Sequence, residues 1–576
     1  MARNCPDGTS RSNPSSATTP PSNSRRIPRS RIELPVVESS WAGRFIAVHG
    51  MINRYNRASM TRCLMALAVL LTLTSILPAQ TAAPAKHDTS RYFVIQVIDD
   101  QAGRGVPLVQ LRTVANQQFW TDSNGLVALD DPALMGQKVF FFVESDGYEF
   151  PADGFKYRGR TLDVTPGGSA TLQIKRLNIA ERLYRVTGQD IYRDTVLAGR
   201  AAPIKHPLLD ARVVGQDSVQ TIIYRGKIYW FWGDTAWPQY PLGQFATSGA
   251  ISELPGHGGL DPFVGVDLDY FAGPNGFSRP MVDVAGPGPK WIDGLMIVKD
   301  DSGRERLIAN FARMQGLGRT LERGLLIFDD DAAIFRPMVH VPLDAPLYPV
   351  GHPFHVSEGG KDYFYFPVPF PVIRVAADFR SVKDLASYEA YTCLVAGTRY
   401  RRGGSKLDRA SDGSLNWGWK RHTSPVGPGQ ERQLIAAGVM KDSESRFILH
   451  DAQSDRAVIA HGGSVCYNAF RKKWIMIFVE AGGRSSYLGE VWYAQADAPL
   501  GPWHWARKIV THNHYSFYNP AQHPFFDQQG GKIIYFEGTY ANTFSGDDHP
   551  TPLYDYNQIM YRLDLSDPRL AMPELP

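Results

Sequence analysis

The chain has few cysteines and no pattern of them that would define a disulfide framework or a zinc site. Only four occur in 576 residues, and Cys393 and Cys466 are the two that follow residue 85. Two cysteines allow at most one disulfide, and neither a CxxC pair nor a zinc-ligand spacing is present. The sequence therefore excludes a small disulfide-stapled scaffold, and two free thiols are favoured over one disulfide.

A basic surface is also lacking. The net charge of +4 comes from residues 1–80, which hold 10 Lys and Arg against 3 Asp and Glu and leave a balance of −3 for the rest. No basic patch for nucleic acid remains after that subtraction. The sequence also contains no GxSxG, phosphate-binding loop or dinucleotide fingerprint in a strand-to-helix setting, which argues against serine-nucleophile and nucleotide chemistry.

Only one long apolar run is present, at residues 64–77, with Arg62 before it and small residues after it. This order predicts a secretory signal peptide, and the run is short for a membrane span. We therefore assign residues 51–86 to a signal peptide and linker, with no integral membrane domain, and expect a secreted or periplasmic bacterial protein. Residues 1–50 are rich in Ser, Pro and Arg and are expected to be disordered or to lie upstream of the true start codon.

Aromatic residues are plentiful, at 12% of the chain, and they lie mainly in segments of strand composition. Residues 91–177 contain five such segments separated by turns, which predicts a small β-sandwich. The stretches VIDDQAGRGVPLVQLRT and FWTDSNGLVAL resemble carboxypeptidase-regulatory-like, transthyretin-like sandwiches of secreted bacterial enzymes. The resemblance implies an accessory domain that is dispensable for chemistry.

One hairpin design recurs five times after this region: a polar start, an apolar strand, a polar turn, an aromatic strand and a polar end. The copies are residues 213–235, 291–314, 348–369, 460–483 and 518–540. Regularly repeated antiparallel hairpins are typical of β-propellers. The prediction is an all-β chain with a five-bladed β-propeller over residues 183–570; two stacked sandwiches are the rival architecture.

The hairpins also predict a site. In an antiparallel pair, the start of the first strand and the end of the second lie at one edge, so the polar residues there are expected to gather around one mouth. These residues are Asp217, Asp234, Asp293, Arg313, His461, Glu480, Asn519 and Glu537.

The same stretches carry a second resemblance. GQDS (215–218), YRGKIYWFWGDT (224–235), GEVWYAQADAPLGPW (489–503) and YNPAQHPFFDQQGGKIIYFEG (518–538) resemble the five-bladed propeller glycosidases. That superfamily includes arabinanases, β-xylosidases, fructosidases and neoagarooligosaccharide hydrolases, and the GQD and FWGDT stretches also resemble propellers of unknown function. The likeness covers roughly two thirds of the chain and implies a glycoside hydrolase.

Glycoside hydrolysis needs two carboxyl groups with different pKa values across a sugar-sized gap. The resemblance implies that Asp217, at the start of the first inner strand, activates water or attacks the sugar, and Asp234 ends the same hairpin. Glu480 and Glu537 each follow a strongly apolar strand, where burial would raise a carboxyl pKa, so either is a candidate acid. A structural role at the hub is the alternative for all four.

Other polar residues near the expected mouth are candidates for substrate binding: Asp293, Arg313, His352, His461, Tyr518, Asn519 and His523. No cofactor is required, although analogy allows a Ca²⁺ ion in the central channel. A non-catalytic carbohydrate-binding propeller and a polysaccharide lyase remain the alternative functions. The sequence leaves open the sugar and linkage, endo or exo action, retention or inversion, which glutamate is the acid, and the oligomeric state.

Overall fold

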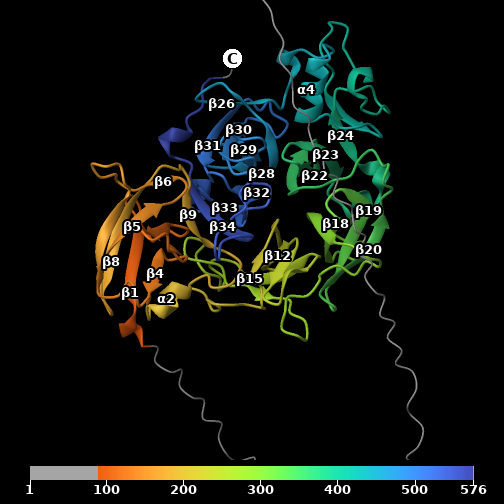
Figure 1. The fold of residues 1–576 in the computed structure, drawn as a ribbon. Helices are drawn as coiled ribbons and strands as arrows, with labels where there is room; N and C mark the ends of the chain where they lie inside the picture. The colour runs from red at the N-terminus through yellow and green to blue at the C-terminus, as the bar shows by residue number, and fades with distance from the viewer. Residues whose placement is uncertain (1–87, 575–576) are drawn as a thin grey trace, which may run out of the picture. The chain divides into compact units, whose positions relative to one another are not determined.

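The computed structural model describes residues 88–574, which are built almost wholly of β-strands (Figure 1). The predicted disordered segment and the predicted signal peptide lie outside these residues. Within the described part of the chain no helix is long and apolar enough to cross a membrane. Cys393 and Cys466 are both free thiols. The helical segments are α2 (Arg193–Leu197), α3 (Phe379–Lys383), α4 (Pro428–Ala436), η1 (Thr89–Arg91), η2 (Leu385–Ser387), η3 (Arg402–Gly404), η4 (Asp442–Glu444), η5 (Pro524–Phe526), η6 (Gln529–Gly531) and η7 (Pro568–Leu570).

Two four-stranded sheets come first along the chain and are called the N-terminal sheets below. In spatial order the first contains β4 (Leu126–Leu129), β1 (Phe93–Asp99), β8 (Ser169–Arg176) and β6 (Tyr148–Glu149), and the second contains β3 (Gln118–Trp120), β2 (Gln110–Thr113), β5 (Gln137–Glu144) and β7 (Gly159–Val164). Every second residue of β1 is buried, as in a strand with one face in a core. Ile95 of β1 shares one hydrophobic cluster with Leu111 of β2 and Phe141 of β5, so the core lies between the two sheets.

Five larger sheets follow, numbered I to V in chain order. Sheet I contains β11 (Gln220–Tyr224), β12 (Lys227–Trp232), β15 (Ser248–Glu253) and β16 (Asp269–Tyr270), and sheet II contains β17 (Lys290–Lys299), β18 (Glu305–Gln315), β19 (Arg319–Asp329) and β20 (Ile334–His340). Sheet III contains β21 (Phe354–Glu358), β22 (Lys361–Pro367), β23 (Pro371–Ala376), β24 (Glu389–Thr392) and β25 (Gly418–Arg421).

Sheet IV has six strands: β27 (Ala457–Val458), β26 (Leu449–Asp451), β31 (Trp505–Val510), β30 (Val491–Ala496), β29 (Lys473–Glu480) and β28 (Ala460–Asn468). Sheet V contains β32 (Ser516–Gln522), β33 (Ile533–Ala541), β34 (Asn557–Asp564) and β9 (Glu181–Arg185). A smaller sheet contains β10 (Gly215–Gln216), β13 (Thr235–Trp237) and β14 (Tyr240–Gln244). Each of the sheets I–V contains the two strands of one predicted hairpin, and these two strands pair antiparallel. All five predicted hairpins are therefore present.

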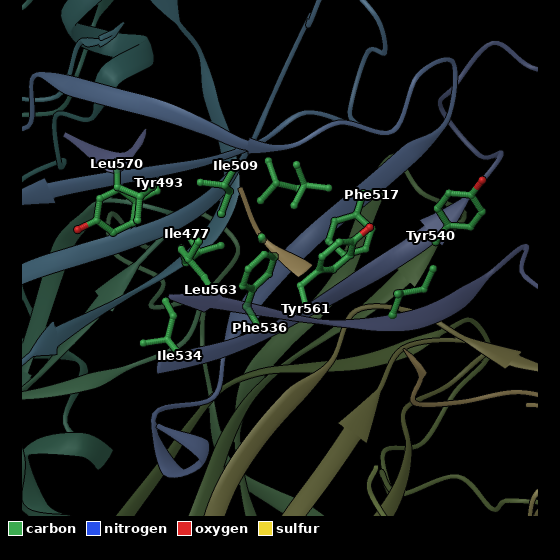
Figure 2. Close-up of a cluster of buried hydrophobic side chains, with 14 of the residues drawn as sticks. Ile477, Tyr493, Ile509, Phe517, Ile534, Phe536, Tyr540, Tyr561, Leu563 and Leu570 are labelled. Carbon is green, nitrogen blue, oxygen red and sulfur yellow. The ribbon is translucent and has the colours of Figure 1, made fainter. Parts of the chain in front are cut away.

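Each sheet shares a cluster of buried side chains with the next, and sheet V shares one with sheet I. The pairs that represent these clusters are Phe231 with Leu307 (I and II), Ile308 with Phe364 (II and III), Tyr391 with Phe478 (III and IV), Ile477 with Phe536 (IV and V), and Tyr535 with Trp230 (V and I). Figure 2 shows the cluster between sheets IV and V. Because a strand between two sheets is buried on both faces, all nine residues of β33 are buried. The five sheets thus follow one another in a closed ring.

Sheet V is completed by a strand from the beginning of this region. Strand β9 pairs antiparallel with β34, with Tyr184 opposite Met560 and Arg185 opposite Ile559. The pairing joins segments more than 370 residues apart and covers an edge of β34 that would otherwise expose unpaired backbone groups. It also brings the end of the N-terminal sheets against sheet V.

A substitution in the packing between sheets IV and V tests whether the sheets form the closed ring. Replacing Phe536, which is fully buried between sheets IV and V, by Ala should lower the free energy of unfolding by about 3–5 kcal/mol, because a buried cavity replaces the ring. Phe155, which is 84% exposed, provides the matched control, and its replacement by Ala should change that free energy by less than about 0.5 kcal/mol. Equilibrium unfolding in urea measures both, and equal effects would contradict the packing described above.

Candidate active site

A cavity of about 480 Å³ lies where sheets I–V present the starts of their first strands. This volume is in the range of small-molecule sites. Seven of the eleven residues predicted from the sequence line the cavity: Asp217, Asp234, Asp293, His352, His461, Tyr518 and Asn519. All five sheets contribute to its wall, so the antiparallel geometry of the hairpins does bring distant polar residues together.

Bulges at the cavity end of three first strands help to aim these side chains. The pairing register shifts after Asp293 in β17, after Ala460 in β28 and after Tyr518 in β32. A bulge interrupts the strict alternation of side chains between the two faces of a sheet. As a result the consecutive residues Tyr518 and Asn519 both line the cavity, with Asn519 in a left-handed conformation at φ 50°.

Asp217 lies just before β11, and both of its carboxyl oxygens accept hydrogen bonds. The backbone N–H of Asp234 donates to Oδ1 at 3.0 Å, and the Tyr518 hydroxyl donates to Oδ2 at 3.1 Å. Burial, followed by the negative charge of Asp234, raises the pKa of Asp217 to about 7, while hydrogen bonds from Tyr518 and Tyr556 act in the opposite direction. The carboxyl group therefore exchanges its proton near neutral pH.

Asp234 follows β12 and lies beside Asp217. Trp291 donates its indole N–H to Asp234 Oδ1 at 2.8 Å, and burial raises the pKa of Asp234 to about 6. Gly233 makes this close approach possible, because a Cβ atom there would lie 2.2 Å from Asp217 Oδ1. The two carboxyl groups form one coupled pair at the first hairpin.

Unlike those to Asp217, the hydrogen bonds to Asp293 all reach one carboxyl oxygen. Its Oδ1 accepts hydrogen bonds from the backbone N–H groups of Gly294 at 2.7 Å and Gly351 at 2.8 Å, and from Gln220 Nε2 at 3.2 Å. Within residues 88–574 its Oδ2 has no hydrogen-bond partner. Burial raises the pKa of Asp293 to about 7. A proton on this carboxyl group would therefore reside on Oδ2.

The cavity histidines are held in their neutral form. Burial, with a smaller contribution from the charge of His523, lowers the pKa of His352 to about 4. Partial desolvation also lowers the pKa of His461, at the exposed rim. At neutral pH these imidazoles offer hydrogen bonds without positive charge, which suits sugar hydroxyl groups.

Glu480 and Arg313 do not line the cavity, contrary to the expectation that all hairpin ends gather there. Glu480 is buried and forms an ion pair with Arg456, and its Oε2 accepts the indole N–H of Trp492 at 3.0 Å. Arg313 binds Glu322 at 3.0 Å. Trp492 and Glu322 lie on the strands next to those of Glu480 and Arg313, and Arg456 lies just before β27, so both groups are satisfied away from the cavity.

Glu537 and His523 also lie outside the cavity lining, in the core between sheets V and I. After the bulge in β32, Glu537 is opposite Ala521, deeper in the sheet than Asn519. The Glu537 and His523 side chains are fully buried, with His523 Nε2 3.5 Å from Glu537 Oε1. His523 Nδ1 is 3.1 Å from Thr221 Oγ1. The sequence located the correct end of the strand, but the bulge changed which side chain reaches the cavity.

Four residues that the sequence analysis did not select also shape the site. Gln220 donates a hydrogen bond to Asp293, and Trp291 donates one to Asp234. The other two, Phe544 and Tyr556, come from the loop between β33 and β34. Trp291 is two residues before Asp293, a strand spacing that places both on one face. That spacing could have identified it, whereas a loop residue such as Tyr556 carries no periodic signal.

The lining of this cavity contains three aspartates and no Lys or Arg. In the part of the chain that the structure describes, no group of three or more His, Cys, Asp or Glu side chains is arranged to hold a metal ion. The three aspartates titrate near neutral pH, so they can take part in proton transfer and in nucleophilic or general-base action.

Comparison with known proteins finds distant structural neighbours. No family model and no curated protein matches the chain. A GH43_1 enzyme from Xanthomonas citri complexed with xylose is 11% identical, with 64% of this chain and 92% of that chain covered and a TM-score of 0.32.

Two further solved structures are similar to the same degree. An exo-β-1,3-galactanase from Phanerochaete chrysosporium with galactose is 8% identical, with 68% and 67% of the two chains covered and a TM-score of 0.32. A calcium-free GH43 β-xylosidase/α-arabinofuranosidase from a compost microbial metagenome, complexed with xylotriose, is 12% identical, with 64% and 96% covered and a TM-score of 0.31. Solved structures similar to the chain thus include GH43 glycoside hydrolases, and any functional conclusion has to rest on the cavity itself.

Proposed function

We propose that the protein is a secreted or periplasmic glycoside hydrolase that acts on a poly- or oligosaccharide through carboxyl groups of the central cavity. In this proposal sheets I–V are the blades of a five-bladed propeller, and the N-terminal sheets are the predicted β-sandwich. The observation that carries it is the gathering of Asp217, Asp234 and Asp293 in one cavity, with pKa values raised to about 7, 6 and 7. Such a site can hold one carboxyl group ionised and another protonated at neutral pH.

The hydrogen bonds divide the roles. Both oxygens of Asp217 accept hydrogen bonds, which leaves neither oxygen free to carry a proton, so in this proposal Asp217 is the base or nucleophile and Asp234 tunes it. Asp293 has three donors on one oxygen and the other oxygen free to carry a proton, so it is the general acid in this proposal. This replaces Glu480 and Glu537 as candidate acids. The proposal assigns no step to Ca²⁺.

The cavity favours hydrolysis over the alternative functions. A polysaccharide lyase would act on acidic sugars and would need a cation to neutralise the substrate carboxylate, but no Lys or Arg lines the cavity. Three carboxyl groups that are buried at a cost in solvation and titrate near neutral pH favour a catalytic role over binding alone. Incubation with plant, algal and mycobacterial glycans tests the proposal: new reducing ends support it, whereas unsaturated uronate absorbance or retention without products would overturn it.

The charge on Asp217 should be essential. Asp217→Asn keeps the size of the side chain but removes the negative charge that activates water or attacks the sugar. We expect turnover to fall by roughly 10²–10⁴-fold with the circular dichroism spectrum unchanged. Near-normal hydrolysis by the folded variant would refute the role of this residue.

The acid can be identified by the leaving group. Asp293→Asn should reduce hydrolysis of natural glycans far more than hydrolysis of aryl glycosides with acidic phenol leaving groups, which depart without protonation. Glu480→Gln should lower thermal stability by weakening the contact with Arg456 but should affect both substrate types equally. The opposite result would make Glu480 the acid again: Glu480→Gln would then be selectively poor on natural glycans, and Asp293→Asn would not.

The pH profile of kcat/KM should be bell-shaped with its maximum near neutrality. Activity should fall on acidification as Asp217 and Asp234 take up protons, and on alkalinisation as Asp293 loses its proton, because burial has raised all three pKa values. In Asp293→Asn the alkaline limb should disappear for substrates that need no acid. Initial rates between pH 4 and 10 measure this, and a profile without an alkaline limb in the wild-type protein would contradict it.

A further inference from the structure

The loop of residues 542–556, which joins β33 to β34, contributes a wall of the cavity and is called the cavity loop here. Its Thr543, Phe544 and Tyr556 line the cavity. Tyr556 lines the cavity beside Asp217, and its hydroxyl group helps to lower the pKa of that carboxyl group. Phe544 packs edge-to-face on Tyr518, with ring centres 5.8 Å apart. The cavity loop therefore lies beside the proposed base or nucleophile, Asp217, and contacts Tyr518, which donates a hydrogen bond to that carboxyl group.

The cavity loop has a backbone that local sequence does not favour. Phe544, Leu553 and Tyr556 have φ values of 65°, 65° and 60°, in the left-handed region that non-glycine residues rarely adopt. Such conformations are unfavourable for non-glycine residues and persist only where their surroundings hold them. Gly215 permits one of these contacts, because a Cβ atom there would lie 2.4 Å from the carbonyl oxygen of Tyr556.

The strongest hold on the cavity loop comes from the N-terminal sheets. Tyr554 is buried, and its hydroxyl donates to the carbonyl oxygen of Thr121 at 2.6 Å and accepts from the N–H of Leu108 at 3.0 Å. Arg185 of β9 lies over the Tyr554 ring, 4.7 Å from its centre, and donates to the Leu553 carbonyl oxygen. The Tyr554 hydroxyl is thus held from outside sheets I–V, whereas the Leu553 carbonyl oxygen and the Tyr554 ring are held by β9 of sheet V.

Sheet V supplies the second hold. Tyr515 donates its hydroxyl hydrogen to Asp555 at 2.7 Å and accepts the N–H of Thr551 at 2.9 Å. Asp555 also accepts the N–H of Asn542 at 2.6 Å. These bonds tie the loop to its own sheet, but within the described part of the chain the Tyr554 hydroxyl bonds only to Thr121 and Leu108, beside the N-terminal sheets.

We propose that the N-terminal sheets are part of the catalytic apparatus, because through Tyr554 they hold the cavity loop in the conformation that places Tyr556 against Asp217. Tyr554 is a positioning residue that acts through Tyr556. This inference rests on the proposed function for its kinetic consequences and replaces the expectation that the domain at residues 91–177 is dispensable for chemistry.

The test removes single tyrosine hydroxyl groups, one at a time, from the full chain. Tyr554→Phe keeps the ring beneath Arg185 and removes the bonds to Thr121 and Leu108. Tyr148→Phe is the matched control, because the Tyr148 hydroxyl also lies at this boundary, accepting the Arg182 N–H at 3.4 Å, but does not touch the cavity loop. Hydrogen–deuterium exchange of residues 542–556 should accelerate by about 2–10-fold in Tyr554→Phe and stay unchanged in Tyr148→Phe.

Kinetics then separate positioning from stability. Tyr554→Phe and Tyr556→Phe should each lower kcat/KM by about 2–10-fold and move its acidic limb to higher pH, because Asp217 loses a hydrogen bond that favours its ionised form. If Tyr554 acts through Tyr556, the double variant should resemble Tyr556→Phe alone. Unchanged exchange in Tyr554→Phe, equal exchange in Tyr148→Phe, or additive kinetic effects would overturn the inference. The exchange result does not depend on activity, so it remains decisive even if the protein hydrolyses no glycan.

Discussion

The closure of the ring of sheets is the constraint on which the rest of the structure depends. Pairing of β9 with β34 fixes sheet V beside sheet I, and the shared cluster around Trp230 and Tyr535 buries the two faces that an open arrangement would leave in water. Because every sheet then has a neighbour on both sides, the start of each first strand points toward one common cavity. The position of the acidic groups follows from this closure and not from any local motif.

Burial is the main cause of the raised pKa values of the carboxyl groups in the cavity. Asp217, Asp234 and Asp293 are carboxyl groups of one residue type, and burial is the largest cause of the raised pKa in each. The carboxyl groups differ in their hydrogen bonds. Both oxygens of Asp217 accept one, whereas in Asp293 only Oδ1 accepts hydrogen bonds from the described residues. In the proposed mechanism, the placement of a few N–H and O–H donors distinguishes the base from the acid.

The sequence predicts those parts of the fold and site that depend on strand periodicity. The hairpins, and the nearness of Asp217 to Asp234, follow from antiparallel geometry and are visible in the pattern of apolar and polar residues. The roles proposed for Glu480 and Glu537 rested on the same pattern, but a salt bridge and a bulge direct these side chains elsewhere. Tyr556 could not be found this way, because contacts distant in sequence determine its position.

The buried carboxyl groups also have a consequence for the durability of the protein. Each has a folded-state pKa above its unfolded value, so between about pH 4 and 7 the native state binds more protons than the unfolded chain, and stability falls as pH rises through this window. The protein is therefore expected to resist heat best in mild acid, below the pH at which the cavity is most reactive. Replacing Asp293 by Asn would relieve this penalty and, under the proposed role of this residue, would give a more robust protein with little activity on natural glycans, a trade-off between durability and catalysis that is set by solvation.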